Sequence, residues 1–223
     1  GEIITLIGAN GAGKSSTLRA IAGLVKPASG SIVFEGDDIT GKDPTAIVTK
    51  GITLVPEGRK IFPDLTVLEN LRYGRPDAAM DEIEAAVKAV SADQIIARLP
   101  DGYNTDIGEG GNTLSTGEKQ LLSFARALLA DPRIFVLDEA TSSVDTVTER
   151  LIQDAIEKVM AGRTSFIIAH RLSTIRRADV ILVVHDGKII ESGTHRSLME
   201  AKGAYYQLYT RQYREEQTRS MME

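Results

Sequence analysis

The stretch at residues 8–15, with the sequence GANGAGKS, constrains this chain more than any other. It matches the pattern G-x-x-x-x-G-K-[ST]. An apolar, β-branched segment precedes it at residues 2–7, and a segment with helical spacing of apolar residues follows it at 16–24. A strand, a glycine-rich turn and a helix in this order form a phosphate-binding loop, so the pattern indicates a nucleoside triphosphate as ligand.

The loop contains each group that a triphosphate requires. Glycines at 8, 11 and 13 allow successive backbone N–H groups to point at phosphate oxygens, and the helix N-terminus adds its positive dipole end. Lys14 would neutralise the β- and γ-phosphates, and the Ser15 hydroxyl would ligate Mg²⁺. A plain glycine-rich turn with a solvated lysine is the alternative, which the flanking elements make improbable. The predicted nucleotide-binding residues here are Gly8, Asn10, Gly11, Ala12, Gly13, Lys14, Ser15 and Ser16.

Composition narrows the class of protein. With 223 residues, 42% of them hydrophobic, the chain suits one medium-sized domain with a substantial core. The absence of cysteine excludes disulfides and thiolate metal sites, and a net charge of −5 gives no electrostatic reason to expect nucleic acid as a partner. No apolar run approaches the ~20 residues of a membrane span. The abrupt start at Gly1 suggests a fragment.

Strand-like and helical segments alternate at both ends of the chain. Strands are expected at residues 52–55, 133–137, 164–169 and 180–185, a hairpin at 31–39, and helices at 44–50 and 147–160. Residues 66–71, 80–90 and 92–99 are expected to form helices, which suggests a helical lobe inserted into an α/β body. Alternation of this kind predicts a mostly parallel sheet covered on both faces.

Two carboxylates follow the strand expected at residues 133–137. Ligands bind at the carboxyl ends of parallel strands, which is where Asp138 and Glu139 fall. Asp138 could hold Mg²⁺, directly or through its water, and Glu139 could polarise the water that attacks the γ-phosphate. Alone, an acid pair after a strand is as often a helix cap. Together with the phosphate-binding loop it indicates a hydrolytic site.

The segment LSTGEKQ at residues 114–120 precedes an apolar helix. Ser115 can cap that helix, and Glu118, three residues on, completes a capping box. With this segment the order of motifs resembles the nucleotide-binding domain of ATP-binding cassette (ABC) proteins. The resemblance covers nearly the whole chain and also includes a Ser-x-x-Asp stretch at residues 142–145 and the late His170.

The resemblance implies an α/β P-loop NTPase fold with a RecA-like parallel sheet, an inserted helical subdomain and a reduced antiparallel β subdomain. It implies that Ser115 and Gly117 cap a nucleotide held by a second cassette, so that two cassettes sandwich two ATP molecules. His170 is then the residue that contacts the γ-phosphate, and Lys14, Glu139 and His170 are the expected catalytic residues. The implied cofactors are ATP and Mg²⁺, and the implied partners are a second nucleotide-binding domain and a transmembrane domain. The location would be cytoplasmic, at the inner face of the membrane.

Three positions depart from the family pattern. Thr116 replaces a Gly and Glu118 replaces a Gln in the L-S-G-G-Q signature, and Glu57 stands where the family has a Gln. Glu57 could still reach Mg²⁺, so the expected metal ligands are Ser15, Asp138 and Glu57. The departures leave open an alternative, a cassette that binds ATP but hydrolyses it weakly or not at all. A cassette acting on DNA or translation is a third reading, which the lack of a second cassette disfavours.

The expected organisation is one domain. Residues 1–57 and 131–195 would form the α/β core, 58–130 the helical subdomain, and 196–223 the C-terminal helices. Residues 8–68 resemble the ATPase of branched-chain amino acid importers, whereas 72 onward resembles exporter cassettes, so a chimera joined near 65–74 is one hypothesis and a divergent single lineage the other. The family's upstream strands, with the aromatic that stacks on adenine, are absent, which predicts poor discrimination between ATP and GTP.

Overall fold

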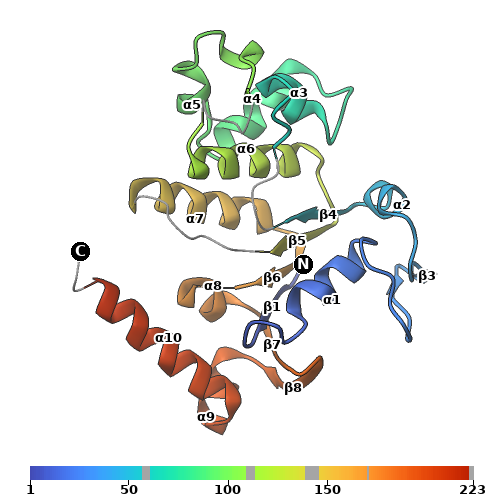
Figure 1. Ribbon diagram of the computed structural model, residues 1–223, viewed down its shortest axis with the longest axis vertical. Helices are drawn as coiled ribbons and strands as arrows, with labels where there is room; N and C mark the ends of the chain where they lie inside the picture. Colours follow the sequence, from blue (N-terminus) through green and yellow to red (C-terminus); the bar gives the residue numbers. More distant parts are fainter. Residues whose placement is uncertain (57–60, 109–113, 139–145, 170, 221–223) are drawn as a thin grey trace. The chain divides into compact units, whose positions relative to one another are not determined.

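The computed structural model describes residues 1–56, 61–108, 114–138, 146–169 and 171–220 (Figure 1). The chain divides into two compact units. Unit 1 comprises Gly1–Lys50, Val136–Glu139 and Thr164–Glu223, and unit 2 comprises Gly51–Phe135 and Ala140–Arg163. The domain limits expected from the sequence remain a prediction.

Unit 1 carries the larger part of a parallel sheet. Its strands follow the order β5-β6-β1-β7-β8, and β1 pairs in parallel with both β6 and β7, whereas β8 runs antiparallel to β7. The strands are β1 (Ile3–Ile7), β5 (Ile134–Asp138, of which the last three residues lie in unit 1), β6 (Thr164–Ile168), β7 (Val180–His185) and β8 (Lys188–Gly193). The mixed α/β fold with a parallel-sheet core is therefore confirmed.

These strands form because their residues are β-branched or large and apolar, which suits a sheet buried on both faces. Leu6, Val136, Ile167 and Ile181 are each no more than 3% exposed. On the helical side, Leu18 of α1 (Lys14–Ile21) is fully buried. The core of unit 1 thus includes the strand that precedes the phosphate-binding loop and the helix that follows it.

Helix α1 differs from its expected range of 16–24. It begins at Lys14, within the last two residues of the loop motif, and ends at Ile21. The end is early because Gly23 adopts a positive φ of 74°, and the Leu24 N–H returns to the Arg19 carbonyl at 2.8 Å. A left-handed glycine that closes the last turn is a common way to stop a helix.

The remaining elements of unit 1 are a small hairpin, three short helices and the longer C-terminal helix α10. The expected hairpin is a two-stranded antiparallel sheet in which Val33 pairs with Asp38 and Phe34 with Asp37. The helix expected at residues 44–50 is also present, as α2, whereas the sequence did not predict the helix at residues 172–177, α8. These elements are β2 (Val33–Phe34), β3 (Asp37–Asp38), α2 (Pro44–Thr49), α8 (Leu172–Arg177), α9 (His195–Ala201) and α10 (Ala204–Ser220).

Unit 2 is organised around one long helix, α6 (Thr116–Leu129), which packs against α3, α4, α7 and β4. The middle of α6 is buried on all sides, since residues 120–125 are all buried, and Leu121, Leu122 and Phe124 are at most 1% exposed. The other elements are β4 (Ile52–Val55), α3 (Val67–Arg72), α4 (Met80–Ala89), α5 (Asp93–Ala97), the 3₁₀ helix η1 (Gly102–Asn104) and α7 (Thr146–Met160). The helices expected at 66–71, 80–90 and 92–99 are confirmed.

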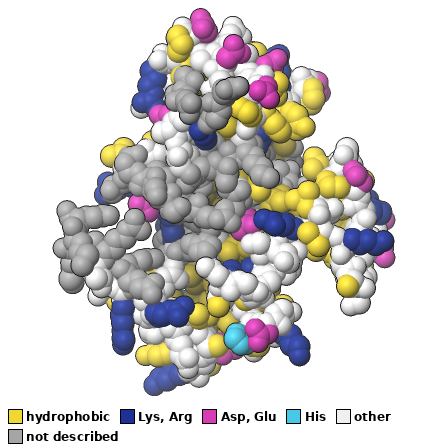
Figure 2. Space-filling view, in the orientation of Figure 1, with side chains coloured by type: hydrophobic (Ala, Val, Ile, Leu, Met, Phe, Trp, Pro, Cys, Tyr) yellow, Lys and Arg dark blue, Asp and Glu magenta, His cyan; other side chains and the backbone are white. Residues whose placement is uncertain are grey.

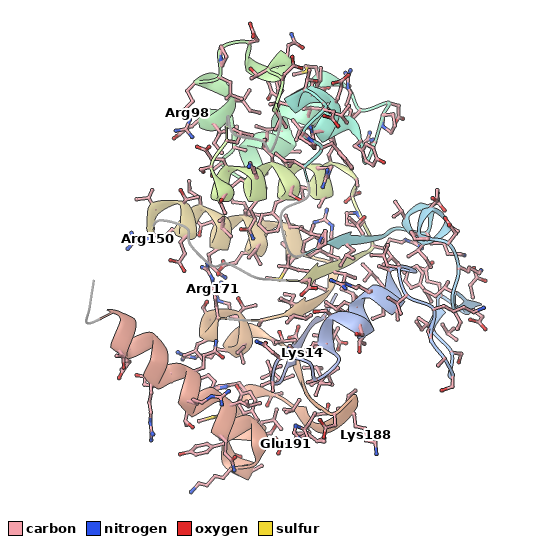
Figure 3. The ribbon with its side chains drawn as sticks, in the orientation of Figure 1. Lys14, Arg98, Arg150, Arg171, Lys188 and Glu191 are labelled. Atoms are coloured by element: carbon pink, nitrogen blue, oxygen red, sulfur yellow. The ribbon has the colours of Figure 1, made fainter. Side chains whose placement is uncertain are left out.

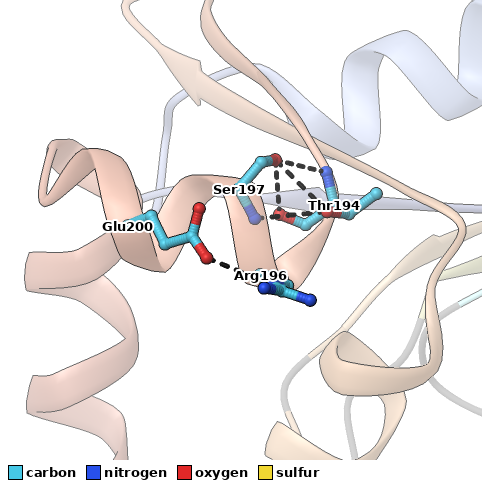
Figure 4. Close-up of polar contacts among 4 residues, drawn as sticks. All are labelled: Thr194, Arg196, Ser197 and Glu200. Carbon is cyan, nitrogen blue, oxygen red and sulfur yellow. Dashed lines mark hydrogen bonds and ion pairs between the residues drawn. The ribbon is translucent and has the colours of Figure 1, made fainter.

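Side-chain caps decide where several of these helices begin. The Thr66 hydroxyl accepts a hydrogen bond from the Glu69 N–H, and the Glu69 carboxylate accepts one from the Thr66 N–H, which is a capping box. Thr194 and Ser197 form the equivalent pair at the start of α9, where Arg196 and Glu200 form an ion pair one turn apart (Figure 4). Each box satisfies N–H groups that the helix cannot bond internally.

The C-terminal helix α10 is part of unit 1 and contributes one tyrosine to its core. Tyr205 is fully buried, its hydroxyl lies 2.6 Å from Nδ1 of His195, and its ring stacks on Tyr209. Tyr213 is 46% exposed, so the tyrosine stripe packs at its first turns only. Tyr205 is therefore a core residue of unit 1.

Within the described ranges, no helix combines the length and the apolarity needed to cross a membrane. Figure 2 shows that basic and acidic side chains are interspersed on the visible face of both units.

Candidate nucleotide-binding site

The phosphate-binding loop has a backbone that requires glycine. Gly8, Gly11 and Gly13 have φ values of 152°, 82° and 104°, in the region that side chains with a Cβ rarely adopt. At Gly8 the space is closed as well, because a Cβ there would lie 2.1 Å from the carbonyl oxygen of Val184. The glycines that the motif demands for phosphate access are therefore also demanded by the fold of unit 1.

A second turn supports the loop from the side. The N–H of Gly187, in the turn between β7 and β8, donates a hydrogen bond of 2.9 Å to the carbonyl oxygen of Ala12. A Cβ on Gly13 would be in contact with the Cα of Gly187, 3.5 Å away. Sequence reasoning missed this support, and the one available signal was the Asp186-Gly187 turn itself.

Lys14 lies at the first position of α1 and points back along the loop (Figure 3). Its Nζ donates hydrogen bonds to the carbonyl oxygens of Gly8 and Ala9, at 2.8 and 2.9 Å, and the residue is only 7% exposed. Burial lowers the pKa of the Lys14 ammonium, while the negative charge of Asp138 acts in the opposite direction. A cation that has lost much of its water is a strong binding partner for a phosphate oxygen.

Ser15 and Asp138 meet although 123 residues separate them in the chain. The Ser15 hydroxyl donates a hydrogen bond of 3.3 Å to Oδ1 of Asp138, which is 6% exposed at the end of β5. A serine oxygen and a carboxylate oxygen are ligands that Mg²⁺ accepts. Among the described residues no group of three or more His, Cys, Asp or Glu side chains could hold a metal ion. The pair therefore suits Mg²⁺ that also binds phosphate oxygens and water, as it does with nucleotides.

Asn10, Ala12 and Ser16 are the other residues that the sequence predicted to bind the nucleotide. The side chains of Asn10 and Ser16 are exposed, whereas Ala12 is buried at 5%. The structure thus brings together all the predicted nucleotide-binding residues of residues 8–16 with the predicted metal ligands Ser15 and Asp138. Glu57, Glu139, His170 and the Ser-x-x-Asp stretch lie outside the described residues.

The signature segment, residues 114–120, lies in unit 2. Ser115 is the N-cap of α6 and its side chain is exposed, whereas Gly117 is buried in the first turn. The Ser115 hydroxyl accepts a hydrogen bond of 3.3 Å from the Glu118 N–H, and the Glu118 carboxylate accepts one of 2.7 Å from the Ser115 N–H. The capping box expected from the sequence is confirmed.

Comparison with known proteins agrees with this geometry. Residues 1–142 match the sequence family described as ABC transporter. The chain is 47% identical over 214 residues to the uncharacterized ABC transporter ATP-binding protein YfiC of Bacillus subtilis, covering 96% of the chain and 35% of that protein. It is 43% identical over 215 residues to the ATP-dependent lipid A-core flippase of Chromohalobacter salexigens, covering 96% of the chain and 37% of the flippase.

Among solved structures, a bacterial Atm1-family ABC exporter with ATP bound superimposes with a TM-score of 0.83 and 38% sequence identity. That alignment covers 95% of this chain and 36% of the exporter. The chain therefore spans little more than a third of the length of each of these three proteins. With a family match over more than half of its residues, this chain belongs to the ABC transporter family.

Proposed function

We propose that this chain is the ATP-hydrolysing cassette of an exporter-type ABC transporter. It binds Mg-ATP in the loop of residues 8–15, pairs with a second cassette and transmits hydrolysis to a transmembrane partner. The observation that carries this proposal is the hydrogen bond between Ser15 and Asp138 directly beside the buried Lys14. It unites the two motifs that were identified separately in the sequence.

The residues of the loop bind and orient the triphosphate. Backbone N–H groups at the start of α1 and the positive end of its dipole face the phosphates. Lys14 exchanges its two carbonyl partners, Gly8 and Ala9, for phosphate oxygens, and the partly dehydrated ammonium gains more from that exchange than a solvated one would. Phosphoryl transfer depends mostly on such positioning and on charge stabilisation.

Ser15 and Asp138 would hold Mg²⁺, with Glu57 as a further ligand. When bound, Mg²⁺ supplies positive charge that offsets the negative charge of the phosphate oxygens. Glu139 follows Asp138 in the chain and acts as the general base on the attacking water, and His170 contacts the γ-phosphate. The assignment of Glu57, Glu139 and His170 depends on the family pattern, since they lie outside the described residues.

The proposed assembly requires other protein domains. Ser115 and Gly117 at the start of α6 cap the nucleotide of a second cassette, which explains an exposed serine hydroxyl at a helix N-terminus. The aligned part is only 35% of YfiC and 37% of the flippase, which leaves ample sequence in those proteins for a transmembrane domain. With that domain in the membrane, this cassette lies at its cytoplasmic face.

The comparisons favour a hydrolysing cassette over a weakly hydrolysing one, because one relative is named an ATP-dependent flippase. The importer-like character of residues 8–68 and the join near 65–74 stay a separate proposal. The alignment with YfiC covers 96% of the chain and so runs across that region. Comparing residues 1–64 and 75–223 separately with importer and exporter cassettes would test it, and equal similarity of both parts to exporters would contradict it.

The experiment for the main proposal is Mg-ATP turnover of the purified chain beside Glu139→Gln. Glu200→Gln is the matched control, because it makes the same carboxylate-to-amide change in an exposed ion pair on α9 (Figure 4). We expect turnover in the parent chain and in Glu200→Gln, and turnover lowered by at least about a hundredfold in Glu139→Gln, as when a general base is removed.

Size-exclusion chromatography with and without ATP completes the experiment. The Glu139→Gln chain should elute as a dimer only with ATP, because it binds the nucleotide without hydrolysing it. Turnover that Glu139→Gln leaves unchanged would refute the catalytic assignment. A chain that neither binds ATP nor dimerises would refute the proposal as a whole.

A further inference from the structure

Glu118 differs from the glutamine of the family signature, and its environment explains how the extra negative charge is accommodated. The residue is the third position of α6, and its side chain is 16% exposed. One carboxylate oxygen, Oε2, accepts the hydrogen bond from the Ser115 N–H at 2.7 Å. The capping box therefore uses only half of the carboxylate.

The other oxygen, Oε1, forms an ion pair with the guanidinium of Arg98. Arg98 is the C-cap residue that follows α5, and it lies in the same unit as α6 (Figure 3). Its side chain is 63% exposed, so the cation reaches from solvent to a carboxylate that is largely covered. The pair thus brings a positive charge to the first turn of the signature helix.

The chemistry of the two amino acids makes this pairing specific to glutamate. A glutamine could accept the Ser115 N–H bond with its single oxygen, but its NH₂ group would then face Arg98, donor against donor. A glutamate satisfies both partners and, without Arg98, would leave a largely buried carboxylate with an uncompensated charge. Glu118 and Arg98 therefore function as a pair.

We propose that Arg98 is a positioning residue of the signature segment, which neutralises Glu118 so that Ser115 and the start of α6 can face the phosphates of a nucleotide bound by a partner cassette. This inference rests on the proposed function, because it takes the contact between signature and nucleotide from it. An unpaired carboxylate within the first turn of α6 would repel a triphosphate and weaken the positive end of the helix.

The same unit contains a closely matched control. At the start of α4, Oε2 of Glu82 accepts a hydrogen bond from the Ala79 N–H, and Oε1 of Glu82 pairs with Arg75. Glu82, like Glu118, is the third residue of its helix, and the Arg75 side chain is 38% exposed. Arg75→Gln therefore breaks an ion pair of the same design at a helix that carries no signature.

The experiment measures ATP-dependent dimerisation in the Glu139→Gln background, by analytical ultracentrifugation, for the parent and for Arg98→Gln, Glu118→Gln, their combination, Arg98→Lys and Arg75→Gln. A dimer of this chain contains two signature segments, so a roughly threefold weakening at each site lowers the association constant by roughly tenfold in Arg98→Gln. Arg98→Lys keeps the positive charge, so its association constant should fall less than that of Arg98→Gln. The double variant should return to within about twofold of the parent, because no carboxylate remains to be neutralised.

Further measurements distinguish an effect of the lost positive charge on dimerisation from an effect of the substitution on folding. ATP binding to the monomer should be equal in all variants, and every variant should remain folded at the assay temperature in thermal unfolding. Arg98→Gln should lower the unfolding midpoint more than Arg75→Gln, because the Glu118 side chain is 16% exposed and that of Glu82 is 39% exposed. The loss of dimer affinity in Arg98→Gln should become smaller in about 1 M salt, where the screening length falls to about 3 Å. In the hydrolysing chain, Arg98→Gln should raise the protein concentration needed for half-maximal turnover and leave kcat unchanged.

Failure of this inference and failure of the proposed function give different results. If the parent Glu139→Gln chain dimerises with ATP and Arg98→Gln does so equally well, or if Glu118→Gln does not rescue Arg98→Gln, the positioning role is wrong and the function stands. If the parent does not dimerise with ATP at all, the sandwich itself is refuted, and the role of Arg98 is refuted with it.

Discussion

The hydroxyl of Ser15 lies 3.3 Å from Oδ1 of Asp138, so the residue after the loop lysine and the last residue of β5 form one polar pair. The pair joins the beginning of α1 to a strand that is not adjacent to β1, since β6 lies between them. This contact is the proposed Mg²⁺ site.

Ser15→Ala should remove a ligand for Mg²⁺ without disturbing the loop backbone. We expect the affinity for ATP in the presence of Mg²⁺ to fall by about tenfold or more, and the affinity in the presence of a chelator to change little, because a hydrogen bond to a charged group contributes about 1.5–3 kcal/mol. Isothermal titration calorimetry with and without Mg²⁺ measures both. Thr17→Ala removes a hydroxyl that donates to the Gly13 carbonyl in the same turn, and it should preserve the Mg²⁺ effect. An equal loss with and without Mg²⁺ would argue against a metal ligand.

Gly8→Ala should destabilise unit 1 as well as impair nucleotide binding. The added Cβ would lie 2.1 Å from the Val184 carbonyl oxygen, at a φ of 152°. We expect a loss of at least about 2–3 kcal/mol in the free energy of unfolding, the range of strain at a special backbone position. Denaturant unfolding measures it. Gly30→Ala, with a φ of 81° and no atom within 4 Å of its Cβ, should lose only about 1 kcal/mol. Equal losses at the two positions would show that the clash is relieved.

Mutations at Glu191 and Gly203 should have non-additive effects on the free energy of unfolding. The Glu191 carboxylate accepts hydrogen bonds from the N–H groups of Ala204 and Tyr205, at 2.6 and 2.9 Å, and so caps α10 from β8 (Figure 3). A Cβ on Gly203 would lie 2.1 Å from Oε1 of Glu191. We expect Glu191→Ala to lose about 1–2 kcal/mol of stability, as other helix caps do.

Gly203→Ala should be destabilising because it displaces that carboxylate. The double variant should lose less than the sum of the single ones, by about 1 kcal/mol, since the clash disappears with the carboxylate. A double-mutant cycle by urea unfolding tests this. Additive losses would mean that Gly203 is required for another reason.

The stability of unit 1 should depend on His195 below neutral pH. Burial lowers the pKa of His195 in the folded chain, and the positive charge of Arg176 acts in the same direction. Because the folded pKa is below the ordinary value of 6.5, the unfolded chain binds the proton more readily. The contribution of neutral His195 is therefore complete above pH 6.5 and is lost as the pH falls through the folded pKa.

Urea unfolding at a series of pH values between about 5 and 8 measures this dependence. Protonation also turns Nδ1, which neutral His195 presents to the Tyr205 hydroxyl, into a donor. His195→Gln should flatten the profile over this interval, whereas His185→Gln, at a side chain that is 64% exposed, should leave it unchanged. A profile that keeps its slope in His195→Gln would assign the effect to another group.

Local patterns in the sequence were enough to predict the phosphate-binding loop, most strands and the helices of unit 2. Each depends on neighbours within a few residues: the glycines and lysine of residues 8–15, the period-3.6 apolar face of α6, and the capping box of Ser115 and Glu118. The early end of α1 was missed, because the glycine that stops it was not treated as a left-handed residue. Such features follow from backbone conformation and short-range hydrogen bonds, which the sequence by itself determines.

Contacts between distant residues were decided only by the tertiary structure. Nothing near Gly8 indicates that the Val184 carbonyl blocks its Cβ, and nothing near Ala12 indicates that Gly187 supports it. Glu118 was recognised as a charge in an unusual place, but its partner Arg98 belongs to a different helix. The physical reason is the same in each case. Close packing determines which side chains and carbonyl groups are in contact, and it depends on the whole core rather than on neighbours in the chain.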